Sequence, residues 1–190
     1  MRPLLLLAYL LLTATAARAA RVDTLAIASA AMHKSYRAAV VLPASYAKNK
    51  KANYPVLYLL HGAYGHFSDW LSKTPDKQLL HRLADQYNLI IVTPEGETFS
   101  FYLDSPVKAD SQFETYLTKE VLPKIDDTYR TVRDRRGRVI AGLSMGGHGA
   151  LFLAARHPDP VRRDSSCSFA ARPRWSRHPS RGSEPHSPHR

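Results

Sequence analysis

The sequence predicts an α/β fold in which a parallel sheet carries helices on both faces. The chain has 190 residues, enough for one domain, and its hydrophobic fraction of 44% is that of an ordinary globular protein. From Tyr54 onward, short apolar segments alternate with segments of helical periodicity, an order typical of strands joined by crossover helices. The near-continuous apolar run YPVLYLL at Tyr54–Leu60 is typical of a strand buried on both faces.

Each expected element follows from its apolar pattern. The predicted strands are Val22–Ile27, Ser35–Leu42, Tyr54–Leu60, Leu89–Val92 and Arg138–Ala141, and the predicted helices are Pro75–Tyr87, Gln112–Asp127 and Met145–Arg156. Pro123 lies late in the second helix and predicts a kink or a shorter helix there. Ligands of such sheets bind at the carboxyl ends of the strands, where His61 and the segment Gly142–Gly146 both fall.

The N-terminus has the pattern of a secretory leader. Arg2 supplies a short positive region, Leu4–Leu12 is apolar but too short to span a bilayer, and Ala17-Arg18-Ala19 fits a cleavage signal. We therefore expect a signal peptide over residues 1–19, no stable membrane anchor, and a secreted or periplasmic protein. The single Cys167 cannot form an internal disulfide.

The character of the chain changes after Val161. Residues 162–190 contain no lysine, seven arginines and no apolar periodicity, so this segment cannot bury enough surface to fold alone. Two interpretations stay open, a natural disordered tail and an out-of-frame translation product. Much of the formal net charge of +11 lies in this tail, and the predicted domain over 20–161 has no nucleic-acid signature.

Gly142-Leu143-Ser144-Met145-Gly146 is the motif that carries chemistry. It follows an apolar strand and opens a helix, which is the context that a nucleophile elbow requires. The flanking glycines let strand and helix pack closely, and Ser144 then takes a strained conformation with its hydroxyl exposed. The helix N-terminus adds positive potential where an oxyanion forms. The alternative is a buried serine in a glycine-rich turn.

The segment His61-Gly62-Ala63 ends the first central strand and can supply the second oxyanion donor. A nucleophile elbow needs a backbone N–H from the loop after that strand, and we assign it to Ala63, paired with the N–H of Met145. Gly62 lets the backbone turn closely under the substrate carbonyl. His61 and Gly62 are thus placed at the substrate, while the His61 side chain is expected to brace the loop by hydrogen bonds.

Other chemistry-bearing residues have simpler interpretations. Asp104 lies in a loop after the second central strand and is assigned to substrate binding, but a cap of the turn before Pro106 is the favoured interpretation of its side chain. Trp70 packs over the oxyanion loop or belongs to the core, and His148 is interpreted as structural. The arginines of 130–138 are interpreted as a solvated turn. The sequence contains no metal-ligand spacing and no phosphate-binding loop, so we expect no cofactor.

Together these residues resemble the Putative esterase family, which is related to esterase D (S-formylglutathione hydrolase). Its successive blocks are matched by Tyr54–Leu60 with His61-Gly62, by Phe101–Pro106, and by Gly142–Ala150. The resemblance covers about Ser35 to Asp159 and implies an α/β-hydrolase fold. It also implies acyl-ester chemistry, in which Ser144 attacks, an acyl-enzyme forms, and water or another alcohol resolves it. The family includes secreted feruloyl and acetyl-xylan esterases and mycolyl-transferring relatives.

The chain departs from the family where the acid and the base of the triad are expected. In this fold the order is nucleophile, acid, histidine, with the last two on loops after later strands. Beyond the helix that ends near His157, neither Asp159 nor any acid or histidine of residues 162–190 follows a recognisable strand. The sequence therefore predicts only the N-terminal portion of the fold, with later strands missing and activity impaired.

Four functions stay open. The first is a secreted carboxylic-ester hydrolase acting on a small-molecule or carbohydrate-linked ester, and the second is an acyltransferase on the same scaffold. The third is a non-catalytic fragment. The fourth is a basic binding module, which rests only on the arginine-rich tail. The sequence specifies neither the acyl nor the alcohol part of the substrate, nor the oligomeric state.

Overall fold

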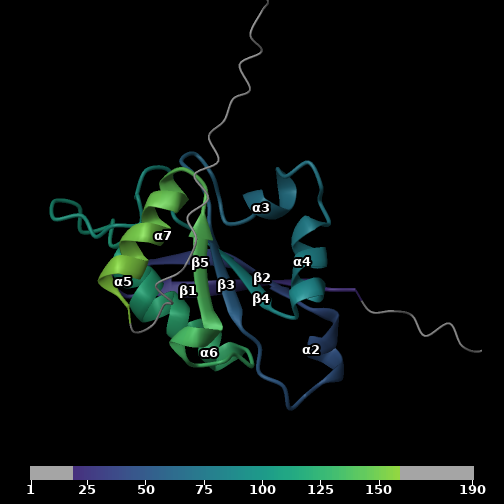
Figure 1. Ribbon diagram of the computed structural model, residues 1–190. Coiled ribbons are helices and arrows are strands. Elements are labelled where there is room, and N and C mark those ends of the chain that lie inside the picture. Colours follow the sequence, from purple (N-terminus) through teal and green to yellow (C-terminus); the bar gives the residue numbers. More distant parts are fainter. Residues whose placement is uncertain (1–18, 159–190) are drawn as a thin grey trace, which may run out of the picture.

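The computed structural model describes residues 19–158, whose five strands form one mixed sheet (Figure 1). The strands are β1 (Arg21–Ser29), β2 (Lys34–Leu42), β3 (Val56–Leu60), β4 (Ile90–Pro94) and β5 (Arg138–Gly142), in the order β1-β2-β4-β3-β5. The first two strands form an antiparallel hairpin, and β2 also runs antiparallel to β4. The parallel part is β4-β3-β5, as the alternation after Tyr54 predicts. The expected leader and tail lie outside the described residues, except Ala19.

The central strand β3 shows why both faces of the sheet are covered by helices. Val56, Tyr58 and Leu60 are at most 5% exposed and belong to one hydrophobic cluster. Leu57 and Leu59 alternate with them and pack against a second cluster on the other face. This period of two, with apolar residues at every position, is what the run YPVLYLL requires of a strand between two layers.

The two clusters correspond to two layers of helices. One face packs against α5 (Phe113–Thr115), the π-helical segment η1 (Tyr116–Val121), α6 (Leu122–Thr128) and α7 (Met145–Arg156). The other face packs against α3 (Asp69–Ser72) and α4 (Leu79–Tyr87). Figure 1 shows these two groups on opposite sides of the sheet, with the short α2 (Ala44–Lys48) beside the α4 group. A short 3-10 turn, η2 (Arg135–Gly137), leads into β5.

The helix predicted over Gln112–Asp127 is present, and Pro123 neither ends nor shortens it. A proline inside an α-helix removes one hydrogen bond, and its ring clashes with the carbonyl four residues earlier, here that of Lys119. The six residues Tyr116–Val121 directly before it are π-helical, so the backbone is wider where the ring needs space. The chain thus accommodates Pro123 near the start of α6.

The helix predicted to begin at Pro75 begins only at Leu79. The Asp76 carboxylate accepts the backbone N–H of Gln78 at 2.9 Å, and Thr74 Oγ1 donates to the carbonyl of Asp76 at 3.1 Å. Such local side-chain bonds to the backbone offer an alternative to helix. The apolar periodicity therefore places the helix correctly but starts it four residues early.

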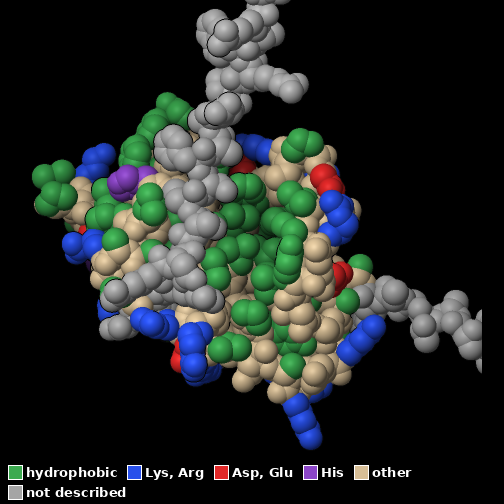
Figure 2. Space-filling model, viewed as in Figure 1, with side chains coloured by type: hydrophobic (Ala, Val, Ile, Leu, Met, Phe, Trp, Pro, Cys, Tyr) green, Lys and Arg blue, Asp and Glu red, His purple; other side chains and the backbone are tan. Residues whose placement is uncertain are grey.

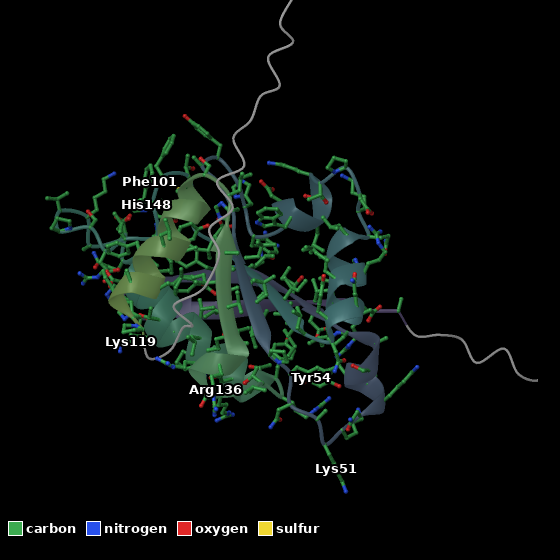
Figure 3. All side chains as sticks on the ribbon, viewed as in Figure 1. Lys51, Tyr54, Phe101, Lys119, Arg136 and His148 are labelled. Carbon is green, nitrogen blue, oxygen red and sulfur yellow. The ribbon has the colours of Figure 1, made fainter. Side chains whose placement is uncertain are left out.

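One arginine of the run 130–138 is not in a solvated turn. Arg138 and Asp126 are each 9% exposed at the side chain, and their charged ends form an ion pair. Arg136, by contrast, is 82% exposed and projects from the lower edge of the molecule (Figure 3). The interpretation as a solvated turn is therefore wrong for Arg138.

Within residues 19–158, no helix combines the length and apolar character needed to cross a membrane.

Candidate active site

Ser144 lies at a tight connection between a strand and a helix. β5 ends at Gly142, α7 begins at Met145, and Ser144 between them is exposed, with φ 53° and ψ −115°. A positive φ is rare for a residue with a side chain and is typical of strained functional positions. This is the backbone conformation that the nucleophile-elbow interpretation requires.

The two glycines of the motif are required by close packing. A Cβ atom on Gly142 would lie 2.4 Å from the backbone carbonyl of Gly146. A Cβ atom on Gly146 would lie 2.4 Å from the carbonyl oxygen of Leu60, at the end of β3. Any larger residue would therefore push α7 away from both strands, and Ser144 would move with it.

The loop after β3 lies directly against this elbow. A Cβ atom on Gly62 would be 3.3 Å from the carbonyl oxygen of Leu143 and 3.6 Å from the Cβ of Ser144. Within residues 19–158 neither the N–H of Ala63 nor that of Met145 has a hydrogen-bond acceptor. Met145 opens a helix, where the first N–H groups have no partner inside the helix. Among the described residues, the two backbone donors predicted for an oxyanion thus have no acceptor; one directly follows Ser144, and the other directly follows Gly62, which packs against Ser144.

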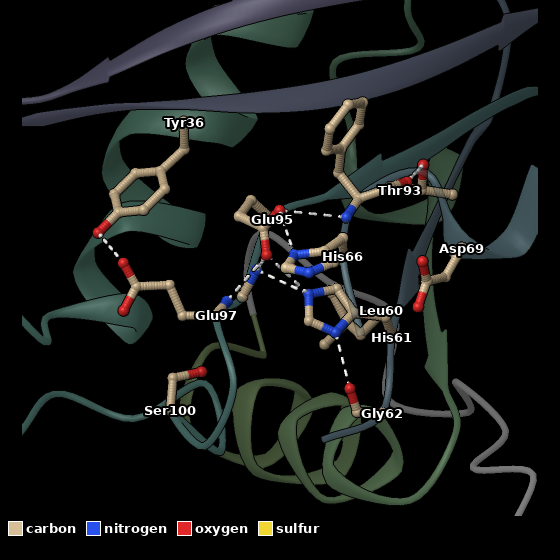
Figure 4. Close-up of polar contacts among 12 residues, drawn as sticks. Tyr36, Leu60, His61, Gly62, His66, Asp69, Thr93, Glu95, Glu97 and Ser100 are labelled. Carbon is tan, nitrogen blue, oxygen red and sulfur yellow. Dashed lines mark hydrogen bonds and ion pairs between the residues drawn. The ribbon is translucent and has the colours of Figure 1, made fainter. Parts of the chain in front are cut away.

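His61 is 2% exposed and makes its contacts inside the loop network (Figure 4). Its Nδ1 lies 2.8 Å from the carbonyl oxygen of Gly62, and its Nε2 lies 2.9 Å from the backbone N of Gly96. The Tyr102 hydroxyl donates to the His61 carbonyl at 3.0 Å. These bonds brace the loop, as the sequence predicts for this side chain. No hydrogen bond joins His61 to Ser144.

Glu95, directly after β4, is a site residue that the sequence analysis missed. Its carboxylate accepts the backbone N–H groups of Phe67 and Glu97 at 3.2 and 3.0 Å and lies 3.3 Å from Nε2 of His61 (Figure 4). Burial favours the neutral acid, but these hydrogen bonds outweigh it and lower the pKa of Glu95 to about 2. The carboxylate therefore ties both ends of the segment 61–67, which we call the oxyanion loop after its predicted role, to the end of β4. The sequence signal that could have identified Glu95 is a charged residue immediately after a buried strand.

The Asp104 side chain makes its hydrogen bonds to α5. Its two oxygens accept the backbone N–H and the hydroxyl of Thr115, at 2.9 and 2.6 Å, so it fastens its loop to α5. The turn before Lys108 is capped instead by Ser105, whose hydroxyl oxygen accepts the N–H of Lys108 at 3.0 Å. The assignment of Asp104 to substrate binding stays a prediction, and it has no contact that supports it.

A cavity of about 410 Å³ opens beside the oxyanion loop. Its walls are the residues His61–Gly65, the α3 region with Asp69, Trp70, Lys73 and Thr74, and Leu143 from the elbow. The Trp70 indole N–H donates to the carbonyl of Leu60 at 3.2 Å, which places the ring under this loop. Figure 2 shows hydrophobic side chains gathered on the same face, between β5 and helices α3 and α4. A substrate group next to Ser144 thus has an apolar space to enter.

A base for Ser144 is not found among residues 19–158. No histidine or carboxylate in this part of the chain makes a hydrogen bond to the Ser144 hydroxyl. His148, one turn into α7, stacks on Phe152 and meets Phe101 edge to face (Figure 3). These ring contacts agree with the structural interpretation of His148.

Comparison with known structures indicates the same fold class as the strand–helix elbow at Ser144. A serine on a strand–helix elbow at the carboxyl edge of a mostly parallel sheet is characteristic of the α/β-hydrolase fold. A solved ferulic acid esterase superposes with a TM-score of 0.67 and 36% sequence identity, over 75% of this chain and 57% of that one. The described residues thus form part of this fold.

The family model described as "Putative esterase" matches residues 29–187, and the chain belongs to this family. An esterase of Mycobacterium tuberculosis is 37% identical over 121 residues, which are 62% of this chain and 25% of the relative. A diacylglycerol acyltransferase/mycolyltransferase of Mycobacterium ulcerans is 36% identical over 126 residues, 62% of this chain and 36% of that protein. The chain therefore spans about a quarter to a third of the length of these curated relatives.

Proposed function

We propose that this chain carries the nucleophile elbow of a secreted carboxylic-ester hydrolase, with Ser144 as the nucleophile. Its Oγ attacks the acyl carbonyl and gives its proton to solvent water, and the carbonyl oxygen becomes an oxyanion. The N–H groups of Ala63 and Met145 stabilise that charge. The alcohol then leaves with a proton from solvent water, and another water molecule hydrolyses the acyl-enzyme, which releases the acid and restores the Ser144 hydroxyl. The observation that carries the proposal is the exposed, strained Ser144 beside two backbone N–H groups that have no acceptor among residues 19–158.

The substrate we propose is a small-molecule or carbohydrate-linked ester. Its support is the cavity beside the oxyanion loop and the membership of the esterase family. Residues 1–19 would direct the protein out of the cytoplasm, with the mature chain starting near Ala20. N-terminal sequencing of protein recovered outside the cytoplasm tests this, and a retained Met1 contradicts it.

We propose further that this chain hydrolyses esters slowly. A serine at its ordinary pKa is a weak nucleophile without a positioned base, and residues 19–158 hold none against Ser144. Removing triad members leaves roughly a 10³–10⁴-fold acceleration over water, from the oxyanion hole and binding. Slow but measurable acyl transfer to Ser144 is thus expected.

The test compares the full chain with its Ser144→Ala variant. We expect the parent chain to hydrolyse p-nitrophenyl acetate slowly and to be labelled by a fluorophosphonate, and the variant to do neither above background. Peptide mass mapping should place the label on Ser144. Equal hydrolysis and equal labelling of the two proteins contradict the proposed nucleophile. Matching unfolding curves confirm that the variant is folded.

An acyltransferase is the second candidate, and the similarity to the mycobacterial mycolyltransferase favours it. The same acyl-enzyme would then be resolved by an alcohol instead of water. Supplying a sugar or glycerol acceptor with the ester distinguishes the two. A transferase forms the transfer ester in preference to the free acid, and a hydrolase forms the acid.

A further inference from the structure

Asp85, an exposed residue of α4, joins two segments that are distant from it in the chain. Its Oδ2 accepts the backbone N–H of Ala20 at 3.2 Å, and its Oδ1 accepts the N–H of Ala44 at 2.6 Å. Ala20 directly precedes β1, and Ala44 opens α2. In Figure 1 the start of β1 lies beside α4. One carboxylate thus holds the residue before β1 against both helices.

Burial begins at Ala20. Ala19 is exposed, whereas Ala20 is 8% exposed and belongs to the hydrophobic cluster between the sheet and α4. The next residue, Arg21, forms the first pair of the β1–β2 ladder, with Leu42. The nitrogen of Ala20 is therefore fixed in position by the core on one side and by the strand on the other.

The bond between Ala19 and Ala20 is also the bond at which the leader is expected to be cut, because Ala17-Arg18-Ala19 fits a cleavage signal. A leader peptidase adds water across this bond. The C–N bond breaks, the hydroxyl joins the Ala19 carbonyl carbon, and the remaining hydrogen joins the Ala20 nitrogen. The new carboxylic acid then gives its proton to the new amine. Ala20 thus gains an ammonium group in place of a neutral N–H.

The charges around this nitrogen make Asp85 its partner. Among the described residues, Asp85 is the only acceptor of the Ala20 N–H. A cavity of about 270 Å³ beside Ala19 has two cations in its walls, Arg21 and Lys50, and Arg21 is itself paired with Asp23 at 3.4 Å. A hydrogen bond from an ammonium group to a carboxylate is roughly twice as strong as one between neutral groups. Cleavage therefore strengthens a contact that the fold already makes.

We propose that Asp85 is the binding site of the α-ammonium group that removal of the leader creates at Ala20. This inference rests on the proposal that residues 1–19 are removed. The new ion pair stabilises α4 against the sheet. Trp70 packs against the same hydrophobic cluster and donates to the carbonyl of Leu60 under the oxyanion loop. The processed chain thus holds this wall of the cavity beside Ser144 more firmly than the unprocessed chain.

The test is a double-mutant cycle in which one change removes the charge at Ala20 and the other removes the charge at Asp85. The processed chain 20–190 is prepared with a free amine and with an acetylated amine, each with and without Asp85→Asn. Acetylation keeps an N–H on the Ala20 nitrogen and restores the amide of the unprocessed chain. The two forms therefore differ at this atom in charge and not in the presence of a donor.

The measurement is urea unfolding in low salt at pH 6.5, below the ordinary α-ammonium pKa of roughly 7.7–8.0. We expect Asp85→Asn to raise the unfolding equilibrium constant about two- to fivefold more in the free-amine chain than in the acetylated chain, the range of a partly exposed ion pair. Salt at about 1 M should reduce this difference, because it screens exposed charges. Acetylation of the parent chain, which needs no substitution, should by itself raise the constant by the same factor.

Asp76→Asn is the matched control, because Asp76 lies just before α4 and its carboxylate bonds to Gln78 and Arg82 instead of Ala20. Its effect should be the same in the free-amine and acetylated chains. The Asp85 site is overturned if Asp85→Asn has equal effects in the two forms. It is also overturned if acetylation leaves the parent chain unchanged, or if Asp76→Asn shows the same coupling.

N-terminal sequencing of the secreted protein separates this inference from the proposals on which it rests. Ala20 as the first residue, with no coupling to Asp85, refutes the Asp85 site alone. A different first residue refutes both the site and the expected cleavage. Fluorophosphonate labelling of Ser144 tests the esterase proposal independently of either result.

Discussion

Replacing Glu95 by glutamine tests whether this carboxylate holds the oxyanion loop in place. The Glu95 side chain is 13% exposed and accepts N–H groups from Phe67, Gly96 and Glu97, with His61 and His66 also facing it. Glutamine keeps the shape but removes the charge that these donors stabilise. We therefore expect Glu95→Gln to lower the free energy of unfolding at neutral pH.

The magnitude follows from the pKa of Glu95, which lies at about 2 in the folded chain against an ordinary value of 4.5. Each unit corresponds to about 1.4 kcal/mol, so the ionised group contributes up to about 3 kcal/mol. Because the folded pKa is depressed, this stability is fully present above about pH 4.5. It is lost as the pH falls through the folded pKa, toward pH 2.

The assay is urea unfolding of the full chain and of Glu95→Gln at several pH values between 7 and 2.5. We expect a difference of up to about 3 kcal/mol at pH 7 that shrinks steadily below pH 4.5. Asp127→Asn is the control, because Asp127 is 72% exposed and its ion pair should contribute under about 1 kcal/mol. A Glu95→Gln difference that is absent at pH 7, or that is undiminished at pH 2.5, refutes the reasoning.

Three further changes test the packing around the elbow and the sheet. Gly146→Ala should destabilise the fold by about 2 kcal/mol or more and lower the melting temperature, because its Cβ would lie 2.4 Å from the Leu60 oxygen. An unchanged melting temperature contradicts that contact. Tyr102→Phe removes the hydroxyl that donates to the His61 carbonyl and should cost about 1 kcal/mol in urea unfolding. Asp126→Asn breaks the buried pair with Arg138 and should cost about 3 kcal/mol, whereas a loss below about 1 kcal/mol shows that the pair is not effectively buried.

The parts of this protein that the sequence predicts well are those determined by local patterns. The run at Tyr54–Leu60 indicates a strand by its unbroken apolarity, and Gly142–Gly146 indicates an elbow because strand, turn and helix are adjacent in the chain. All five strands and the helix Met145–Arg156 are confirmed. The predicted start of α4 was wrong because the Asp76 side chain accepts a backbone N–H, and this bond competes with the helical pattern.

The pairings between distant charges could not be predicted from one sequence. Arg138 lies in a run of arginines, and nothing in that run shows that it is buried against Asp126 while Arg136 is exposed. Glu95 likewise precedes Gly96 in a segment that indicates a turn. Its part in bracing the loop depends on a contact with His61, which follows a different strand, β3. The first contact joins β5 to α6, and the second joins the ends of the neighbouring strands β3 and β4 in the order β4-β3-β5.

That order also explains why the elbow and the oxyanion loop behave as one unit. The carbonyl of Leu60 accepts the N–H of Leu143 at 3.3 Å and the indole N–H of Trp70 at 3.2 Å, and it limits the residue at position 146 to glycine. The next carbonyl, that of His61, accepts the Tyr102 hydroxyl. Two consecutive carbonyls at the end of β3 thus join the elbow, the α3 region and the loop after β4. Because the donors on Ala63 and Met145 depend on this shared anchor, a change on either side should displace both donors relative to Ser144.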